Sequence, residues 1–336
     1  MITEKINIGI IGVGRIGEMH LKNIVQHFPT VAIKGLIDPM LSDNILGLFQ
    51  DQEKLHLDLD EMLLDETINA VIICSPTPTH YETIKKCAKH KKHIFCEKPL
   101  SFSEQELNDI INVGKKEKVS IQVGLNRRFD RDFMLMKEKI DKGIVGDIQM
   151  IHITNHDSKP PSYKFLKSSG GMLLDLCIHD FDMIGFLSGK KIKEIYVNGG
   201  VFIEPRLEDI NDIDNVLITV ELDNGILCSI DSSRQTNYGY DQRVEVFGSK
   251  GSLLVENQKE NLLLFSGETE TKSSKIDNSF IERYKQSYIK QFEHFFDCIS
   301  SKTAPSVGPY NILLAMRSAI AGNQSIDTKQ PQKVKI

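Results

Sequence analysis

Three ionisable side chains are spaced in a way that suits acid–base chemistry. Asp175, His179 and Asp182 stand at positions i, i+4 and i+7 of an otherwise apolar segment. If Met172–Leu187 forms one helix, the segment is buried and these side chains lie on one of its faces. Burying ionisable groups is costly unless they pair or bind something polar. His179 could accept a hydroxyl proton as hydride leaves the same carbon, while Asp175 orients the ring or grips an adjacent hydroxyl.

The same spacing has a structural alternative, in which an Asp–His pair simply satisfies itself in the core. A metal site is disfavoured because no third ligand with suitable spacing is evident in the sequence. The catalytic interpretation also needs a cofactor that accepts hydride.

Three glycines at a fixed spacing supply a place for such a cofactor. Gly12, Gly14 and Gly17 follow the apolar run Ile6–Ile11 and open a helical pattern. In a dinucleotide-binding turn the first glycine permits the tight bend, the second lets the backbone approach a pyrophosphate, and the third allows close contact between helix and strand. The N–H groups at the start of the helix then face the anion. This context favours a nucleotide site over a glycine-rich turn without a ligand.

The second apolar run ends in Asp38, about twenty residues beyond the last glycine. A carboxylate there can accept from both adenosine ribose hydroxyls and repels a 2′-phosphate, so NAD is favoured over NADP. Arg15 argues weakly the other way, because a basic side chain in the glycine loop could reach a phosphate. A solvated Asp38 without a ligand is the structural alternative.

Two further loops leave predicted strands at their carboxyl ends, where doubly wound sheets bind ligands. Residues 74–80 follow one strand, and Glu97-Lys98-Pro99 follows the next. The ammonium of Lys98 could polarise a substrate carbonyl or stabilise an alkoxide beside a nicotinamide, although a surface salt bridge is the alternative. The cofactor contacts that we expect are Gly12, Gly14, Arg15, Ile16, Gly17, Asp38, Ser75, Thr77, His80, Glu97 and Lys98.

The strands and helices that must position these residues are predicted from the hydrophobic pattern. In the first third of the chain, short β-branched runs alternate with helical patterns, the order that builds a parallel sheet covered on both faces. Ser103 with Glu106 forms a capping box that starts a helix. The predicted strands are Ile6–Ile11, Val31–Ile37, Ala70–Cys74, His93–Cys96 and Ser120–Val123, and the predicted helices are Gly14–His27, His80–Lys89 and Ser103–Glu117.

The pattern changes after Val123. We predict an α/β Rossmann domain with a doubly wound parallel sheet over residues 1–124, and an α+β domain with a large open, mainly antiparallel sheet over 125–336. The C-terminal helices of the second domain could pack back on the first. Its predicted elements are a helix at Asp130–Lys142, a strand at Ile148–Thr154, the helix Met172–Leu187, strands from Ile192 to Phe265, an exposed loop at Glu268–Asn278, and helices at Phe280–Ile299 and Pro309–Asn323.

Composition narrows the class of protein. The 336 residues suffice for two cores, and a formal net charge of -5 gives no electrostatic reason to expect a nucleic-acid or membrane partner. The N-terminal residues are typical of a strand rather than a signal peptide, and no stretch approaches a membrane span. Six cysteines lack CxxC spacing, which favours reduced thiols and a cytoplasmic location.

Together, the glycine loop, Glu97-Lys98-Pro99 and the segment Gly-Gly-x-x-x-Asp-x-x-x-His-x-x-Asp resemble the Gfo/Idh/MocA oxidoreductases. The resemblance covers essentially the whole chain, with the three motifs in order. It implies an N-terminal Rossmann domain, an open sheet whose outer face often forms oligomer contacts, and a catalytic constellation of Lys98, Asp175 and His179.

Within that family the chain is most similar to bacterial inositol 2-dehydrogenases. Residues 123–130 look like their polyol-contacting segment, 152–156 like the strand that brings a histidine, and 238–241 like the loop that brings a tyrosine. The implied substrate contacts are Arg127, His156, Asp182 and Tyr238 or Tyr240.

This resemblance implies NAD-dependent oxidation of a cyclic polyol, myo-inositol at its axial hydroxyl, by a homo-oligomer that is a tetramer or a dimer. The alternatives are scyllo-inositol, an aldose or a keto-sugar nucleotide as substrate. A non-catalytic NAD-dependent sensor is a further alternative, because a fold does not fix a function.

Overall fold

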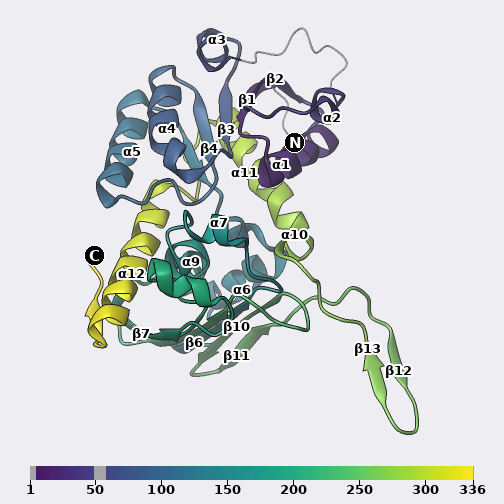
Figure 1. The fold of residues 1–336 in the computed structure, drawn as a ribbon, viewed down its shortest axis with the longest axis vertical. Coiled ribbons are helices and arrows are strands. Elements are labelled where there is room, and N and C mark those ends of the chain that lie inside the picture. The colour runs from purple at the N-terminus through teal and green to yellow at the C-terminus, as the bar shows by residue number, and fades with distance from the viewer. Residues whose placement is uncertain (1–4, 49–57, 336) are drawn as a thin grey trace. The chain divides into compact units, whose positions relative to one another are not determined.

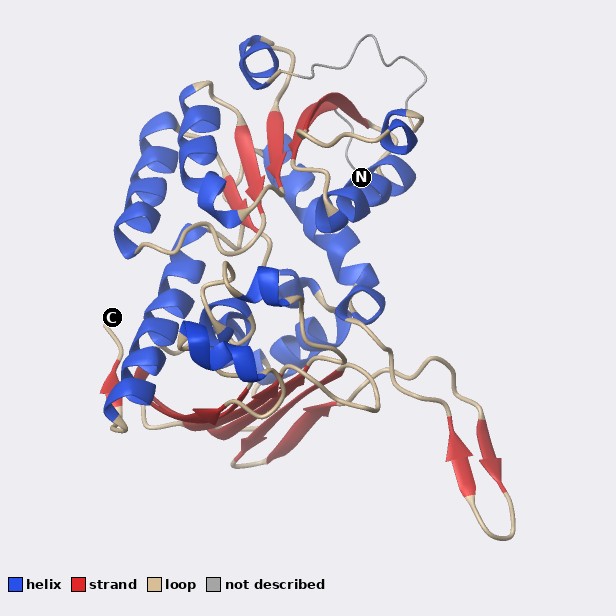
Figure 2. Ribbon diagram, in the orientation of Figure 1, coloured by secondary structure: helices blue, strands red, loops and turns tan. Residues whose placement is uncertain are grey.

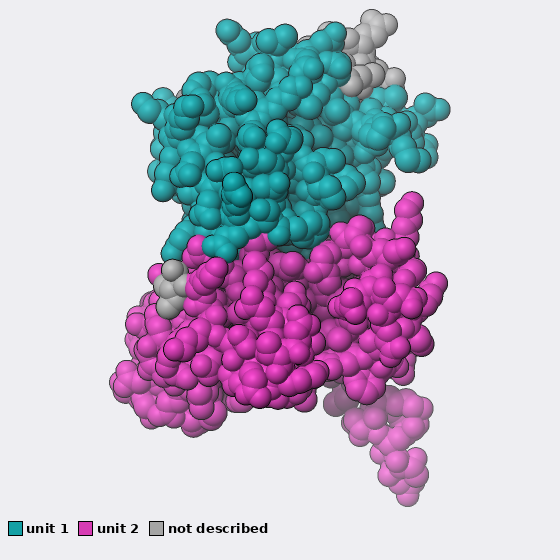
Figure 3. Space-filling view, turned by 60° about the vertical axis from the view of Figure 1, so that its left-hand side comes forward, with its two compact units in different colours: residues 1–126, 286–313 teal, residues 127–285, 314–336 magenta. Residues whose placement is uncertain are grey.

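The computed structural model describes residues 5–48 and 58–335. The chain forms two compact units, which Figure 3 shows in different colours. Unit 1 contains residues 1–126 and 286–313, and unit 2 contains residues 127–285 and 314–336. Each unit is therefore assembled from two separate stretches of sequence. The predicted domain limits, 1–124 and 125–336, remain a prediction, since compactness does not show that a part folds on its own.

Unit 1 is built on a five-stranded sheet with the order β2-β1-β3-β4-β5, in which every neighbouring pair is parallel. The order reverses between β1 and β3, so the loops that follow these two strands flank the switch point where doubly wound sheets bind ligands. The strands are β1 (Ile6–Ile11), β2 (Val31–Ile37), β3 (Ala70–Ile73), β4 (His93–Cys96) and β5 (Ile121–Val123). The predicted doubly wound sheet is confirmed.

Helices cover both faces of this sheet (Figure 1). On one face, α1 and α11 form a core with β1, in which the ring centroids of Phe28 and Phe296 lie 5.3 Å apart in an edge-on arrangement and those of Phe95 and Phe292 lie 4.6 Å apart with tilted planes. Helices α4 and α5 pack together over the other face. The helical elements are α1 (Arg15–His27), α2 (Asp43–Leu46), α3 (Leu59–Leu64), η2 (Thr77–Thr79), α4 (His80–Lys89), α5 (Glu104–Glu117) and α11 (Lys285–Ser301).

Unit 2 is built on a seven-stranded sheet with the order β11-β10-β6-β9-β8-β7-β14. Strands β6 and β9 are parallel, and the other neighbouring pairs are antiparallel. The predicted mainly antiparallel sheet is confirmed. The strands are β6 (Ile148–His156), β7 (Ile192–Gly200), β8 (Asn215–Leu222), β9 (Leu227–Ser233), β10 (Asp241–Gly248), β11 (Gly251–Val255) and β14 (Gln332–Lys333).

One face of this sheet is covered by helices, as Figure 2 shows. Residues of β8 alternate between buried and exposed positions, because successive side chains of a strand point to opposite faces. The uncovered, outer face exposes Leu217, Leu227 and Leu254, each more than half accessible. The helical elements are η3 (Asn126–Phe129), α6 (Arg131–Asp141), α7 (Tyr163–Leu166), α8 (Met172–Asp175), α9 (Ile178–Ser188), η4 (Pro205–Ile210), α10 (Phe280–Arg283) and α12 (Pro309–Thr328).

Three predicted elements were wrong in detail. The predicted helix Phe280–Ile299 is divided at Tyr284 into α10 and α11. The predicted loop Glu268–Asn278 contains β13 (Thr271–Ser273), which pairs with β12 (Leu264–Ser266) to form an exposed hairpin. The predicted helix Met172–Leu187 is broken into α8 and α9, because the amide of Cys177 bonds to the carbonyl of Met172, five residues back. Such a wide turn interrupts the regular i→i−4 ladder. Among the described helices, none is long and apolar enough to cross a membrane.

Candidate functional site

The three glycines after β1 differ in the space around them. Gly12 has φ +85°, and a Cβ built there would lie 2.4 Å from the amide nitrogen of Ser75. A Cβ on Gly17 would lie 2.0 Å from the carbonyl oxygen of Gly12. A Cβ on Gly14 would meet no atom within 4 Å, and no side chain caps the helix that begins after it. Two glycines therefore allow close packing, and the third leaves room beside uncapped helical N–H groups, as a pyrophosphate requires.

Asp38 lies against this glycine loop. Its Oδ2 accepts a hydrogen bond from the amide of Val13 at 2.6 Å, and its Oδ1 accepts from the amide of Met40 at 2.7 Å. The carboxylate is thus fixed beside the loop, where a 2′-phosphate would meet a negative charge. Arg15 and Ile16 form the first turn of α1, and Arg15 is exposed. Contacts of these three residues with a cofactor remain a prediction.

The loop after β3 is held together by its own side chains. The hydroxyl groups of Ser75 and Thr79 lie 2.6 Å apart, and Thr77 begins the short helix η2. His80 is fully buried, with its ring nitrogens 2.8 Å from the carbonyl oxygen of Pro99 and 2.6 Å from that of Ser75. Burial lowers the pKa of His80, although these two carbonyls oppose the shift. His80 therefore links two loops, and its predicted cofactor contact is untested.

Glu97-Lys98-Pro99 follows β4 with a cis bond between Lys98 and Pro99. The carboxylate of Glu97 accepts a hydrogen bond from Nε2 of His20 at 2.7 Å. A Cβ on Gly124 would lie 2.7 Å from the same carboxylate, so the loop is closely packed. His20 is fully buried within α1, and its contact with Glu97 could not be predicted because 77 positions separate the two residues. Lys98 is half-buried at this loop.

The residues around the break between α8 and α9 differ in burial. Within residues 172–184, all described, Asp175 and His179 are the two that are not buried. Asp182 is buried and makes a two-bond ion pair with Arg128, at 2.7 and 2.6 Å. The break places Asp175 at the end of α8 and both His179 and Asp182 in α9, so the three residues do not stand on one continuous helix as predicted. Asp175 and His179 reach the surface, and Asp182 is paired inside.

A second buried pair lies beside the first. Arg127 donates to Asp180 at 2.6 Å and to the hydroxyl of Tyr240 at 3.2 Å, and Asn155 donates to Asp180 at 2.7 Å. Burial opposes the charge of Arg127, but the nearby tyrosine and carboxylate groups hold its pKa above the ordinary value. Asp180 was absent from the predicted residues, although it lies next to His179 in sequence. Arg127 and Tyr240 are both buried, and their contact with a substrate remains a prediction.

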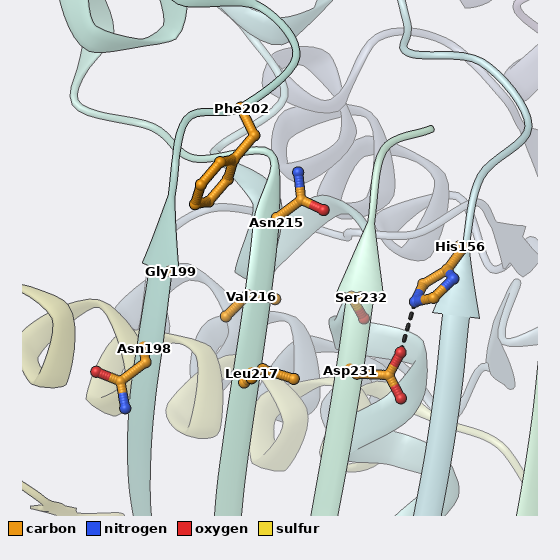
Figure 4. A pocket seen from close by; sticks show the side chains of 9 residues that line it. All are labelled: His156, Asn198, Gly199, Phe202, Asn215, Val216, Leu217, Asp231 and Ser232. Atoms are coloured by element: carbon orange, nitrogen blue, oxygen red, sulfur yellow. Dashed lines mark hydrogen bonds and ion pairs between the residues drawn. The ribbon is translucent and has the colours of Figure 1, made fainter. Parts of the chain in front are cut away.

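His156 and Tyr238 belong to a different group. The carboxylate of Asp231 accepts from Nε2 of His156 at 2.5 Å, a contact drawn in Figure 4. Nδ1 of His156 lies 3.4 Å from the hydroxyl of Tyr238, which donates to Asp241 at 2.8 Å. Burial and Asp241 raise the pKa of Tyr238 to about 12. Burial would raise the pKa of Asp231, but hydrogen bonds, that from His156 foremost, lower it.

The alternation of β6 separates these groups. Asn155 points toward Asp180 on the helix-covered face, and the next residue, His156, points to the outer face. His156 and Asp231 line a hollow of about 450 Å³ on that side (Figure 4). The five predicted substrate contacts therefore do not form one cluster in unit 2: Arg127, Asp182 and Tyr240 lie among the buried ion pairs, and His156 and Tyr238 lie together elsewhere.

Arg234 is a residue that the sequence interpretation missed. It follows β9, is fully buried, and donates from Nη1 to Asp175 at 3.0 Å. All six cysteines are free thiols. Among the described residues, no group of three or more His, Cys, Asp or Glu side chains could hold a metal ion.

Comparison with known proteins gives concordant matches for both parts of the chain. Residues 6–125 match the model of an oxidoreductase family with an NAD-binding Rossmann fold, and residues 133–254 match the GFO/IDH/MocA C-terminal domain. An uncharacterized oxidoreductase of Bacillus subtilis is 38% identical over 99% of this chain and 98% of its own length. A myo-inositol 2-dehydrogenase of Thermotoga maritima is 35% identical over 97% of this chain and 98% of its own.

A solved structure extends the comparison. The scyllo-inositol dehydrogenase of Lactobacillus casei, with bound NAD(H) and scyllo-inositol, superposes with a TM-score of 0.89. It is 25% identical and covers 98% of this chain and 99% of its own.

Proposed function

The chain belongs to the GFO/IDH/MocA family of NAD-dependent oxidoreductases, and from that premise we propose that it oxidises myo-inositol at its axial hydroxyl to the keto-inositol. The choice of substrate is supported mainly by the 35% identity to a myo-inositol 2-dehydrogenase over nearly the whole of both chains. Asp175 and His179 are partly exposed within an otherwise buried segment, which supports an acid–base role there.

The residues of unit 1 fit the cofactor. The open space at Gly14, the uncapped start of α1 and the carboxylate of Asp38 beside the loop suit the pyrophosphate and ribose of NAD. When bound, NAD supplies the nicotinamide ring that accepts hydride. The fixed negative charge of Asp38 supports NAD over NADP.

The residues of the chain take the following parts in the proposed reaction. His179 accepts the proton of the reacting hydroxyl, because a neutral imidazole is a base near neutral pH. Lys98 stabilises the developing alkoxide with its ammonium group, and Asp175 accepts a hydrogen bond from the substrate or the imidazole. Arg127, Asp182 and Tyr240, which lie among the buried ion pairs, are the proposed contacts for the other hydroxyls, which need both donors and acceptors to fix a polyol. His156 and Tyr238 form a separate group and are not assigned to the same substrate.

The protein is proposed to act as a homo-oligomer, a tetramer or a dimer, in the cytoplasm. The exposed leucines of the outer sheet face support self-association, since burying apolar side chains in an interface is favourable. The six free thiols support a reducing compartment.

The test is a panel of myo-inositol, scyllo-inositol, aldoses and keto-sugar nucleotides, with the formation of reduced NAD read by absorbance. We expect kcat/KM for myo-inositol to exceed that of each other compound at least tenfold. Scyllo-inositol is the second candidate, favoured by the Lactobacillus casei structure. A preference for it would replace the proposed substrate. Tight NAD binding without turnover of any compound would instead favour a sensor.

A further inference from the structure

Arg234 and Asp175 form an ion pair in which the two partners are unequally buried. The side chain of Arg234 is 0% exposed, whereas that of Asp175 is 16% exposed. In the three other buried arginine pairs of unit 2 the carboxylate is more enclosed, at 0% for Asp180, 3% for Asp182 and 7% for Asp130. In those pairs the carboxylate is the well-enclosed partner, although the side chain of Arg128 is 13% exposed. The Arg234 pair keeps its cation fully buried and leaves its carboxylate partly exposed.

The guanidinium of Arg234 makes few other polar contacts. In the part of the chain that the structure describes, its Nε and Nη2 atoms are buried without a hydrogen-bond partner. Nη2 lies 4.0 Å from Oδ2 of Asp212, and the backbone amide of Arg234 is held by the carbonyl of Asp214 at 2.9 Å. Burying a guanidinium with unused donors costs stability. This cost indicates that the side chain serves a purpose other than stabilising the fold.

Asp212 fixes the other end of the short helix that carries Asp175. Its Oδ1 accepts a hydrogen bond at 2.9 Å from the amide of Met172, the first residue of α8. A Cβ on Gly171, where φ is +86°, would lie 3.1 Å from that oxygen. The glycine therefore lets the carboxylate approach the backbone. Helix α8 is thus held at its start by Asp212 and at its last residue by Arg234.

We propose that Arg234 is a positioning residue that holds Asp175 as an oriented carboxylate, so that Asp175 acts as a hydrogen-bond acceptor and leaves proton transfer to His179. The proposal rests on the proposed function for its catalytic consequence. The guanidinium of Arg234 donates one hydrogen bond to Oδ2 of Asp175, which holds that oxygen in place, and its charge stabilises the ionised form of the carboxylate. An ionised, paired carboxylate is a weak base, and the neighbouring imidazole is the stronger one.

The experiment compares Arg234→Met and Arg234→Lys with the wild-type holoenzyme. Removing the positive charge leaves Asp175 less compensated, which favours the protonated form of His179. We expect Arg234→Met to lower kcat about 100-fold with unchanged NAD affinity. The acid limb of kcat/KM for myo-inositol should move upward by about one pH unit. Arg234→Lys keeps the positive charge but lacks the planar guanidinium group. The acid limb of the pH profile should therefore return toward its wild-type position, and part of the activity should be retained.

Arg283→Met is the matched control, because Arg283 is equally buried and pairs with Asp130 at 2.7 Å. It should lower thermal stability without moving the limb. NMR titration of the His179 ring, assigned with His179→Gln, reads the same effect without substrate. The proposal would be overturned if Arg234→Met kept the wild-type kcat, the wild-type acid limb of kcat/KM and the wild-type NMR titration of His179. If the wild-type enzyme oxidises no polyol, the proposed function fails, and the titration alone decides the role of Arg234.

Discussion

The glycine loop of unit 1 and the α8–α9 segment of unit 2 are prepared for ligands by different means. The loop uses backbone: Gly14 leaves open space, and helical N–H groups stand uncapped beside it. The segment uses charged side chains, each held by an arginine from elsewhere in the chain. A change at Gly14, where the space is open, should therefore alter cofactor affinity alone. A change in the segment should affect either chemistry or stability, according to how deeply the residue is buried.

The largest expected effect is on the chemistry of the segment. His179→Gln removes the proposed base, and we expect kcat for polyol oxidation to fall about 10³-fold, equivalent to about 4 kcal/mol. Lys98→Met should act similarly by leaving an alkoxide without a cation. The melting temperature should stay near wild type in both variants, because both side chains are only half-buried. NAD affinity should stay near wild type in His179→Gln, because His179 is not among the expected cofactor contacts. His27→Gln, an exposed substitution, is the control, and wild-type turnover in the His179 and Lys98 variants would refute their roles.

The next effect is on the stability of the segment. Arg128→Met leaves the buried carboxylate of Asp182 without its partner, which should lower the free energy of unfolding by about 3 kcal/mol. Urea denaturation measures the loss. Arg206→Met is the matched control, since its pair with Glu204 is open to solvent and should contribute much less to stability than the buried pair. Equal losses in the two variants would show that burial does not separate these pairs.

Substitutions in the glycine loop of unit 1 are predicted to affect the affinity for NAD or the stability of the fold, according to the space around each glycine. Gly14→Ala places a methyl group in open space, so the fold should persist while the Kd for NAD rises about tenfold, or about 1.4 kcal/mol. Gly17→Ala instead meets the carbonyl of Gly12 and should lower the melting temperature. Calorimetric titration with NAD and thermal denaturation distinguish the two. Unchanged NAD affinity in Gly14→Ala would contradict the assignment of this space to the cofactor.

The smallest effect concerns pH. Burial lowers the pKa of His80 in the folded protein, so the unfolded chain binds the proton more readily below its own pKa of about 6.5. The stability contributed by neutral His80 is therefore complete above that pH and declines as pH falls below it. Between pH 7.5 and 5.5 we expect a loss of about 1 kcal/mol or less, seen as a lower melting temperature. His80→Gln should reduce this dependence, and an identical slope would exclude His80 as its source.

Features set by the backbone were predictable from sequence. The strands β1, β2 and β4 have the predicted bounds, and Ser103 caps α5 by accepting from the amide of Glu106. The predicted capping box is incomplete, because the carboxylate of Glu106 bonds to Ser101 instead of the Ser103 backbone.

Side-chain pairing was not predictable. Asp180 and Arg127 are 53 positions apart, and Asp175 and Arg234 are 59 apart. A single sequence carries no signal that joins such residues. The helix break at Cys177 was missed because the apolar pattern continues across it, and periodicity reports burial rather than the hydrogen bonds of the backbone.

The two-part origin of unit 1 bears on how the protein is made. Phe292, Phe295 and Phe296 of α11 are fully buried against the strands near the N-terminus. Residues 127–285 leave the ribosome before these aromatics do, which takes on the order of ten seconds or more at usual synthesis rates. During that interval the nascent nucleotide-binding unit presents an unfilled apolar surface, so its completion waits for nearly the whole chain to be translated.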